Sequence, residues 1–155
     1  MPNIAPDPRV HVAVGVITDG AGQILVARRA DHLHQGGLWE FPGGKVERNE
    51  TVKQALQREL EEELSIQVSA CEPLLQIAHD YNDKAVLLDV WWVSRFAGAP
   101  CGRQDQPLRW VDMAEMHMLQ FPAANLPILA AIEKRIALQP DPDQGLSKSS
   151  DSRSS

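Results

Sequence analysis

One segment, residues 51–64, limits how this chain can fold more than any other. Thr51 and Gln54 stand at the spacing of a capping box, so the sequence predicts that a helix begins at this point. At about 100° per residue, one side of that helix is aliphatic and must face a hydrophobic core. The side chains of this stripe are Val52, Leu56, Leu60 and Leu64. The helix therefore has to pack against the rest of the fold along this stripe.

Three glutamates depart from the simple amphipathic pattern of this helix. On a helical wheel Glu63 lies about 20° from Leu56, and Glu59 lies about 60° away on the same side. Glu62 lies at the edge of the stripe. Like charges four residues apart repel each other, and partial burial makes each carboxylate less favourable. A divalent cation that prefers oxygen ligands would offset both costs, which makes a metal site one interpretation of the pattern.

The alternative is a charged surface helix in which Arg58 pairs with Glu61 or Glu62. Gln54, Arg58 and Glu61 lie on the side opposite the stripe, as this alternative requires. It does not explain the carboxylates that lie along the stripe. Residues 43–45, Gly-Gly-Lys, precede the helix, and glycines let a backbone approach a metal or a phosphate closely. By themselves these three residues are also consistent with an ordinary turn.

Together, the glycine pair and the acidic helix resemble the sequence box of the Nudix hydrolases. That box reads G-x5-E-x7-R-E-U-x-E-E-x-G-U, where U is an aliphatic residue. The matching residues are Gly44, Glu50, Arg58, Glu59, Leu60, Glu62, Glu63 and Ile66. Ser65 stands where the box has its second glycine. A glycine there would end the helix in a left-handed conformation, in which serine costs about 1 kcal/mol.

This resemblance implies an α+β fold, an α/β/α sandwich around a mixed sheet. The implied reaction is Mg²⁺-dependent hydrolysis of a nucleoside diphosphate linked to another group, with Mn²⁺ able to replace Mg²⁺. In such a reaction cations neutralise the pyrophosphate while a carboxylate activates the attacking water. The implied metal ligands are the Gly43 carbonyl, Glu59, Glu62 and Glu63. The implied catalytic residues are Glu59 as general base, Arg58, which orients it, Lys45 at the phosphates and Glu50 in support.

Beyond the box, residues 10–137 resemble the MutT branch of this family, whose members convert 8-oxo-dGTP to 8-oxo-dGMP and pyrophosphate. The likeness includes Ala13-Val14-Gly15, Arg28-Arg29-Ala30, Glu40-Phe41-Pro42-Gly43-Gly44-Lys45 and Phe121-Pro122-Ala123-Ala124-Asn125-Leu126-Pro127. By position, the implied substrate-binding residues are Arg29 at a phosphate, Phe41 along the base pocket and Asn125 at the base. Further implied contacts are Asp83 and Lys84, near a base-pocket loop. Among the histidines, which show no zinc spacing, His34 is the candidate for a ligand contact.

Asn125 offers a physical reason for this substrate. Its amide both donates and accepts, and 8-oxoguanine offers O6 as an acceptor and a protonated N7 as a donor. Unmodified guanine presents N7 as an acceptor, so half of that pairing fails. A site built around such a pair discriminates strongly, because the mismatched partner is buried unpaired. The alternative for Asn125 is a cap on the closing helix, a role that asparagine favours.

Two departures from the family pattern leave further alternatives open. MutT proteins carry another glutamate in the loop before the last strands, where this chain has Gln104, with Asp105 beside it as a substitute ligand. A pyrophosphatase for CTP or another nucleoside triphosphate is the nearest alternative function, although that branch tends to carry aspartate at position 125. Because of Ser65 and Gln104, a catalytically weak binding module of the same family is a third.

The chain has 155 residues and a formal net charge of −6. This charge argues against binding to a nucleic-acid polymer or an anionic membrane, since both need clustered positive charge. No apolar run approaches the roughly 20 residues of a membrane helix, and the N-terminus lacks a signal-peptide pattern. We expect a cytoplasmic monomer whose partner is a small nucleoside triphosphate. Residues 1–9 are expected to be an extension, 10–138 one domain and 139–155 a disordered Ser/Pro-rich tail.

The remaining elements follow from apolar alternation and turn residues. Strands are expected over 10–17, 23–28, 38–41, 66–70, 74–78, 86–96 and 108–111. Helices are expected over 51–64, 112–118 and 122–138. We expect the first two strands to pair as a hairpin across the turn at 19–22. The third strand is expected to stop at Pro42-Gly43-Gly44.

Overall fold

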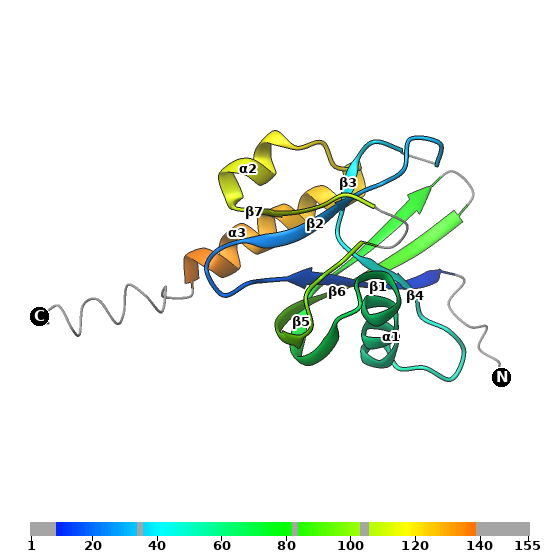
Figure 1. Cartoon of the computed structure of the whole chain (residues 1–155). Coiled ribbons are helices and arrows are strands. Elements are labelled where there is room, and N and C mark those ends of the chain that lie inside the picture. The colour runs from blue at the N-terminus through cyan, green and yellow to red at the C-terminus, as the bar shows by residue number, and fades with distance from the viewer. Residues whose placement is uncertain (1–8, 34–35, 82–83, 103–105, 139–155) are drawn as a thin grey trace, which may run out of the picture.

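In this computed structural model, which describes residues 9–33, 36–81, 84–102 and 106–138, seven strands form two sheets (Figure 1). The larger sheet has the strand order β4-β1-β6-β5. It is mixed, because β1 runs parallel to β6 while the other two pairs are antiparallel. Its strands are β1 (Val10–Ile17), β4 (Gly43–Lys45), β5 (Gln67–Tyr81) and β6 (Lys84–Ala97).

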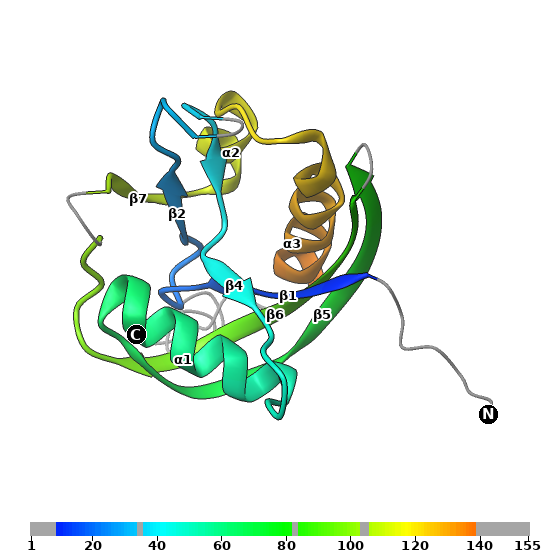
Figure 2. The same ribbon diagram turned by 90° about the vertical axis from the view of Figure 1, so that its right-hand side faces the viewer.

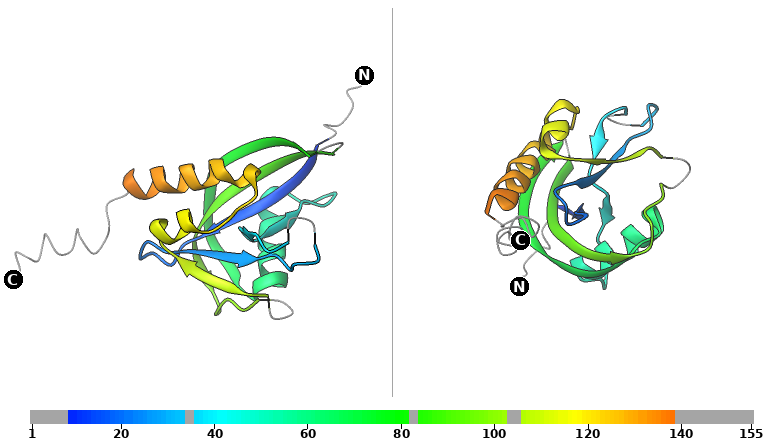
Figure 3. Two further views of the ribbon diagram at one scale, coloured as in Figure 1. Left: turned by 90° about the horizontal axis from the view of Figure 1, so that it is seen from above. Right: turned by 60° about the vertical axis from the view of Figure 1, so that its left-hand side comes forward.

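The smaller sheet is antiparallel and has the order β3-β2-β7. Its strands are β2 (Ile24–Arg28), β3 (Trp39–Glu40) and β7 (Leu108–Val111). The long strands β5 and β6 of the larger sheet curve strongly, as the green ribbons of Figure 3 show. Register shifts along β5 accompany this curvature, and bulges of this kind bend a strand.

The helical elements are α1 (Val52–Leu64), α2 (Met113–Met118), the 3₁₀ turn η2 (Ala123–Asn125) and α3 (Leu126–Leu138). The predicted capping box of α1 is confirmed. The Gln54 N–H donates to Thr51 Oγ1 at 3.1 Å, and the Thr51 N–H donates to Gln54 Oε1 at 2.9 Å. At the other end, Ser65 has φ 60° and ψ 35°, so the left-handed conformation expected at the box glycine is present.

Two hydrophobic clusters lie on opposite faces of β1. Ala13 and Ile17 belong to the cluster that covers the aliphatic stripe of α1, whereas Val14 and Val16 belong to the cluster that includes α3. Successive side chains of a strand point to opposite faces, so β1 is buried on both of them. Figure 2 shows α1 and α3 on either side of β1. The expected α/β/α sandwich around a mixed sheet is confirmed.

The hairpin expected between the first two strands is wrong. Both strands exist, but β1 and β2 lie in different sheets and share only an isolated bridge between Thr18 and Ile24. Both edges of β1 are already occupied, one by β4 and the other by β6. The turn at 19–22 therefore carries the chain from one sheet to the other.

Three further elements differ from the predictions by more than a shift of one or two residues at an end. The third strand ends before Pro42 as expected, but Gly43 and Gly44 then form β4 instead of a turn. Glycine at position 43 allows this close pairing, because a Cβ there would overlap the Ala13 carbonyl oxygen on β1. The two short strands expected over 66–78 are one strand, β5. The closing helix begins with the 3₁₀ turn η2 rather than as a single α-helix. For β4 and β5 the deciding contacts come from distant strands, whereas η2 is closed by the local hydrogen bond from the Asn125 N–H to the Pro122 carbonyl.

The expected extension and the expected tail involve residues 1–8 and 139–155, which lie outside the described residues. No helix in the described part of the chain is long and apolar enough to cross a membrane.

Candidate active site

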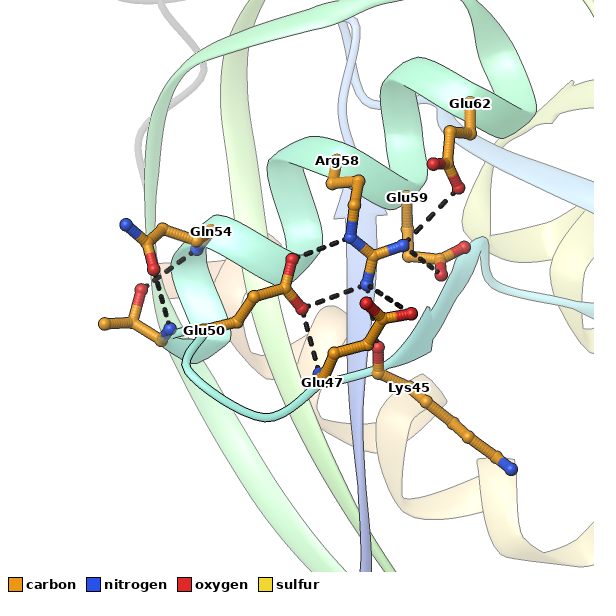
Figure 4. A network of polar contacts seen from close by, with 8 residues as sticks. Lys45, Glu47, Glu50, Gln54, Arg58, Glu59 and Glu62 are labelled. Atoms are coloured by element: carbon orange, nitrogen blue, oxygen red, sulfur yellow. Dashed lines mark hydrogen bonds and ion pairs between the residues drawn. The ribbon is translucent and has the colours of Figure 1, made fainter.

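Arg58 lies at the centre of a network of polar contacts between α1 and the segment before it (Figure 4). Its guanidinium donates to both carboxylate oxygens of Glu50, at 2.7 and 3.0 Å. It also donates to Glu59 at 2.9 Å, to the Lys45 carbonyl at 3.0 Å and to Glu62 at 3.4 Å. We call this set the Arg58 network. The helical wheel placed Arg58 on a solvated side, but its side chain is only 26% exposed, because the loop before α1 folds back over it.

The bidentate pair with Glu50 is the strongest contact of this network. Hydrogen bonds from Arg58 hold the pKa of the Glu50 carboxyl at about 2, below its ordinary value of 4.5, with a smaller contribution from the Glu47 N–H. The same pairing raises the pKa of Arg58. A bidentate arginine–carboxylate pair has a defined geometry, so Glu50 sets the orientation of the guanidinium.

Glu59 lies on the side of Arg58 that faces β4, and its side chain is only 17% exposed. Its carboxylate lies so close to Gly44 that a Cβ there would overlap it. Gly44 is therefore required for a reason other than backbone conformation, since no side chain fits between the strand and the carboxylate. The glycine of the box and the glutamate fifteen positions later form one packed unit.

Glu63 lies one turn after Glu59 on the same helix. Burial, together with the negative charges of Glu59 and Glu40, raises the pKa of Glu63 to about 8, and the Gly43 backbone N–H partly opposes this shift. Backbone hydrogen bonds join Pro42 and Val46 to β1. In an antiparallel pair, the residues that form such bonds alternate with residues whose N–H and C=O groups point away from the partner strand. Gly43 is of the second kind, so its backbone groups point away from β1. The Gly43 carbonyl thus lies on the side of the strand where Glu63 interacts with this residue.

A divalent cation fits this donor set by its chemistry. The available donors are carboxylate and carbonyl oxygens, which divalent cations such as Mg²⁺ prefer. A nearby positive charge would also stabilise the ionised form of a buried carboxyl group whose pKa is raised. In the structure Glu59 and Glu63 interact, but Glu62 is 51% exposed and hydrogen-bonds to Arg58 instead. Within the described ranges, no three His, Cys, Asp or Glu side chains are gathered closely enough to hold a metal ion.

A pocket of about 500 Å³ lies beside this helix–strand unit. Its floor consists mainly of aliphatic side chains from β1 and β6, including Val12, Val14 and Leu88. Six of the residues implied by the family resemblance line it: Arg29, Phe41, Gly43, Lys45, Lys84 and Asn125. The pocket therefore brings together the implied base-binding and phosphate-binding residues. Gly43 and Lys45 connect it to the Arg58 network, since both lie on β4.

Four other predicted residues cannot be placed. His34, Asp83, Gln104 and Asp105 lie outside the described residues. The loop ligand expected at Gln104 or Asp105 stays a prediction.

Glu40 is a pocket residue that the sequence reasoning did not select. Its carboxylate accepts from Arg29 Nη1 at 3.1 Å and from Gln106 Nε2 at 3.5 Å. Burial raises the pKa of Glu40, and Arg29 opposes that shift. The motif that contains Phe41 also contains Glu40, but a single glutamate on a two-residue strand has no periodic signal. Only the sheet pairing shows that it lies beside Arg29.

Asn125 lines the pocket at the end of η2, immediately before α3. Its backbone N–H donates to the Pro122 carbonyl at 2.9 Å. Its side-chain amide has no hydrogen-bond partner among the described residues, so the structure gives no support to the alternative in which this amide caps the closing helix. A pocket-lining amide without an internal partner is available to a ligand.

The family description "NUDIX domain" matches residues 13–131 of the chain. The chain belongs to the Nudix family. It is 34% identical to an 8-oxo-dGTP diphosphatase of Escherichia coli over 126 residues, which are 81% of this chain and 98% of that protein. It is 35% identical to a CTP pyrophosphohydrolase of the same organism over 127 residues, or 82% of this chain and 94% of that protein.

A solved structure of MutT, from work on Aliivibrio salmonicida and Vibrio cholerae, is 37% identical and superposes with a TM-score of 0.73. The match covers 82% of this Nudix chain and 98% of that one. Nudix hydrolases generally use a divalent metal ion, in agreement with the oxygen donors on α1 and β4. The protein is thus a Nudix hydrolase, and its box residues form the helix–strand unit around Arg58.

Proposed function

We propose that this Nudix hydrolase converts 8-oxo-dGTP to 8-oxo-dGMP and pyrophosphate with the help of Mg²⁺. The observation that carries this proposal is the position of Asn125, which lines the same pocket as Phe41 and whose amide is engaged by none of the described residues. The 34% identity with a protein named 8-oxo-dGTP diphosphatase supports it. An asparagine amide complements O6 and the protonated N7 of 8-oxoguanine, while N7 of unmodified guanine cannot donate.

In this proposal the residues of α1 and β4 perform the chemistry. Glu59, Glu62, Glu63 and the Gly43 carbonyl would hold Mg²⁺, which supplies positive charge for the phosphate oxygens. Glu59 takes a proton from the attacking water as that water adds to phosphorus and the bridging P–O bond breaks. Arg58 orients Glu59 through the 2.9 Å hydrogen bond, and Glu50 in turn orients Arg58.

The cations of the pocket would bind the substrate's negative charge. Lys45 extends away from the Arg58 network in Figure 4 and lines the pocket, which suits a phosphate contact. Arg29 lines the pocket and is held by Glu40, so its guanidinium is oriented before a phosphate arrives. Lys84 lies at the start of β6 and adds a third positive charge to the lining.

We assign this activity to the cleansing of the nucleotide pool, in support of DNA repair, by a monomer in the cytoplasm. A pyrophosphatase for CTP is the second candidate, because the chain is 35% identical to a protein of that name. The CTP branch tends to carry aspartate at position 125, so the asparagine of this chain favours the oxidised purine over CTP. The candidates thus differ in what the pocket must recognise, whereas the chemistry at α1 is the same.

One experiment separates the two candidates. Purified protein is given 8-oxo-dGTP, dGTP, CTP, dCTP and dATP in turn with Mg²⁺, and kcat/KM is measured for each by pyrophosphate release. We expect the highest value for 8-oxo-dGTP and no turnover after addition of a chelator. A highest value for CTP would replace the first candidate with the second. Absence of turnover for every nucleotide would contradict both.

A further inference from the structure

Two residues that line the pocket come from separate parts of the fold. Phe41 lies between β3 and β4, and its side chain is only 6% exposed. Asn125 belongs to η2, before α3. Any change in their relative position would alter the contacts of a base bound between them. The contacts that join these two segments therefore affect recognition of the base, although they involve residues that do not line the pocket.

One such contact is an aromatic stack. The rings of Phe41 and Phe121 lie with their centroids 5.2 Å apart and their planes at 14° to each other. Phe121 is half-buried against the core and is not among the residues that line the pocket. A backbone hydrogen bond of 2.8 Å from the Trp39 N–H to the Gln120 carbonyl joins the same two segments. Together these contacts link the segment of Phe41 to the loop that leads into η2.

The path from Phe121 to Asn125 is short and stiff. Pro122 follows Phe121 with φ −59° and ψ 149°, and its ring restricts φ to such values. Its carbonyl accepts the 2.9 Å hydrogen bond from the Asn125 N–H, which closes the 3₁₀ turn. A shift of Phe121 is therefore passed on to Asn125 rather than absorbed by a flexible loop.

We propose that Phe121 is a positioning residue for base recognition, which holds Phe41 and Asn125 at the separation that the base requires. This inference rests on the proposed function. Hydrogen bonds weaken steeply when distance and angle depart from their optimum, so a loosened Asn125 loses its advantage for the matched base first. The chemistry on α1 depends on other contacts and keeps its rate.

The test replaces Phe121 with leucine, which keeps an apolar side chain but removes the ring. The measured quantities are kcat and KM for 8-oxo-dGTP and for dGTP, together with the melting temperature. An aromatic pair contributes enough energy to correspond to about a tenfold change in an equilibrium. We expect Phe121→Leu to lower the preference for 8-oxo-dGTP about tenfold through KM, while kcat stays within about twofold.

The chain offers a matched control. Phe96 stacks on Trp110 with centroids 6.5 Å apart and planes at 16°, and it packs in the other hydrophobic cluster. Neither ring lines the pocket. Phe96→Leu removes a comparable stack, so we expect a lower melting temperature but an unchanged preference. Phe121→Tyr keeps the ring, and we expect it to retain the wild-type preference.

The outcomes distinguish this proposal from the proposed function. A wild-type protein without preference for 8-oxo-dGTP contradicts the proposed function. A wild-type preference that Phe121→Leu leaves intact overturns the role of Phe121, as does an equal loss in Phe96→Leu. If Phe121→Leu does not fold, Phe121→Met provides the same test, since methionine fills more of the ring's volume without stacking.

Discussion

The Arg58 network and the neighbouring pocket place their polar groups differently. In the network one guanidinium donates to three carboxylates and a carbonyl within 2.7–3.4 Å. In the pocket most lining side chains are apolar, and the amide of Asn125 has no partner among the described residues. The network is thus assembled before any ligand binds, whereas the pocket contains an amide that no described residue engages.

From this difference we expect the Arg58 network to determine kcat and the pocket to determine substrate preference. A group already fixed by its neighbours acts on the transition state without reorganisation, and its loss lowers kcat. A group satisfied only by a matched ligand governs which ligand binds, and its loss lowers discrimination. Variants of the two regions should therefore separate kcat from substrate preference. A variant of one region that changes the parameter assigned to the other would break the comparison.

The largest effect is expected for Glu59→Gln. Glutamine has nearly the same size, so it fits against Gly44, but it cannot accept a proton from water. We expect kcat to fall about 1,000-fold with the fold intact, since general bases contribute roughly 10²–10⁴. Steady-state kinetics with 8-oxo-dGTP and circular dichroism measure the two properties. Glu61→Gln, which changes an exposed glutamate of the same helix, is the control. Near-normal turnover in Glu59→Gln would exclude Glu59 as the base.

The pocket counterpart is Asn125→Asp. An aspartate only accepts, so it cannot donate to O6 of the base while it accepts from N7. We expect the ratio of kcat/KM for 8-oxo-dGTP to that for dGTP to fall about 10- to 100-fold, with kcat little changed. Measurement of both substrates on one preparation gives the ratio directly. An unaltered ratio would show that Asn125 does not recognise the base.

A smaller loss of rate is expected for Arg58→Lys. Lysine keeps the charge but loses the planar fork that binds Glu50 and Glu59 at the same time. We expect kcat to fall about tenfold without a change in substrate preference, because Glu59 becomes less well oriented. Arg95→Lys changes an exposed arginine of β6 and serves as the control. A change in preference without a change in kcat would contradict the division between network and pocket.

The Glu50 pKa gives the network a signature in acid. Because the folded-state pKa is about 2 and the ordinary value is 4.5, the ionised carboxylate stabilises the fold above pH 4.5. That contribution is lost as pH falls from 4.5 towards 2. We expect Glu50→Gln to lower the melting temperature at pH 7, and the difference from wild type to vanish near pH 2. Thermal unfolding of both proteins across this range measures it, and a constant difference would contradict the pairing.

The predictable parts of the fold are those governed by short-range signals. The capping pair Thr51 and Gln54, and the aliphatic spacing after it, depend only on residues within α1, and both were predicted correctly. The strand pairings depend on distant partners. The placement of β2 in the second sheet follows from the occupied edges of β1, which no local pattern around residues 19–22 reveals.

The same distinction applies to the site. The box identified the carboxylates around Arg58. The helical wheel placed Arg58 towards solvent, and this was wrong because the loop that carries Glu50 folds back over the helix. Glu40 was missed because its partners, Arg29 and Gln106, lie far along the chain. Spacing within one element shows which residues share a face. It does not show which loop or strand will cover that face.

The smallest effect is expected where the chain departs from the box. Ser65 has φ 60°, a conformation in which a Cβ is strained and glycine is not. We expect Ser65→Gly to raise the free energy of unfolding by about 0.5 kcal/mol, since the relief of strain exceeds the added entropy of the unfolded chain. Asn49 also has a positive φ, 71°, but asparagine tolerates it, so Asn49→Gly should gain less. Urea denaturation measures both variants. Because Ser65 lies outside both the network and the pocket, kcat and substrate preference should stay at wild-type values, and a change in either would show that the end of α1 contributes to the chemistry.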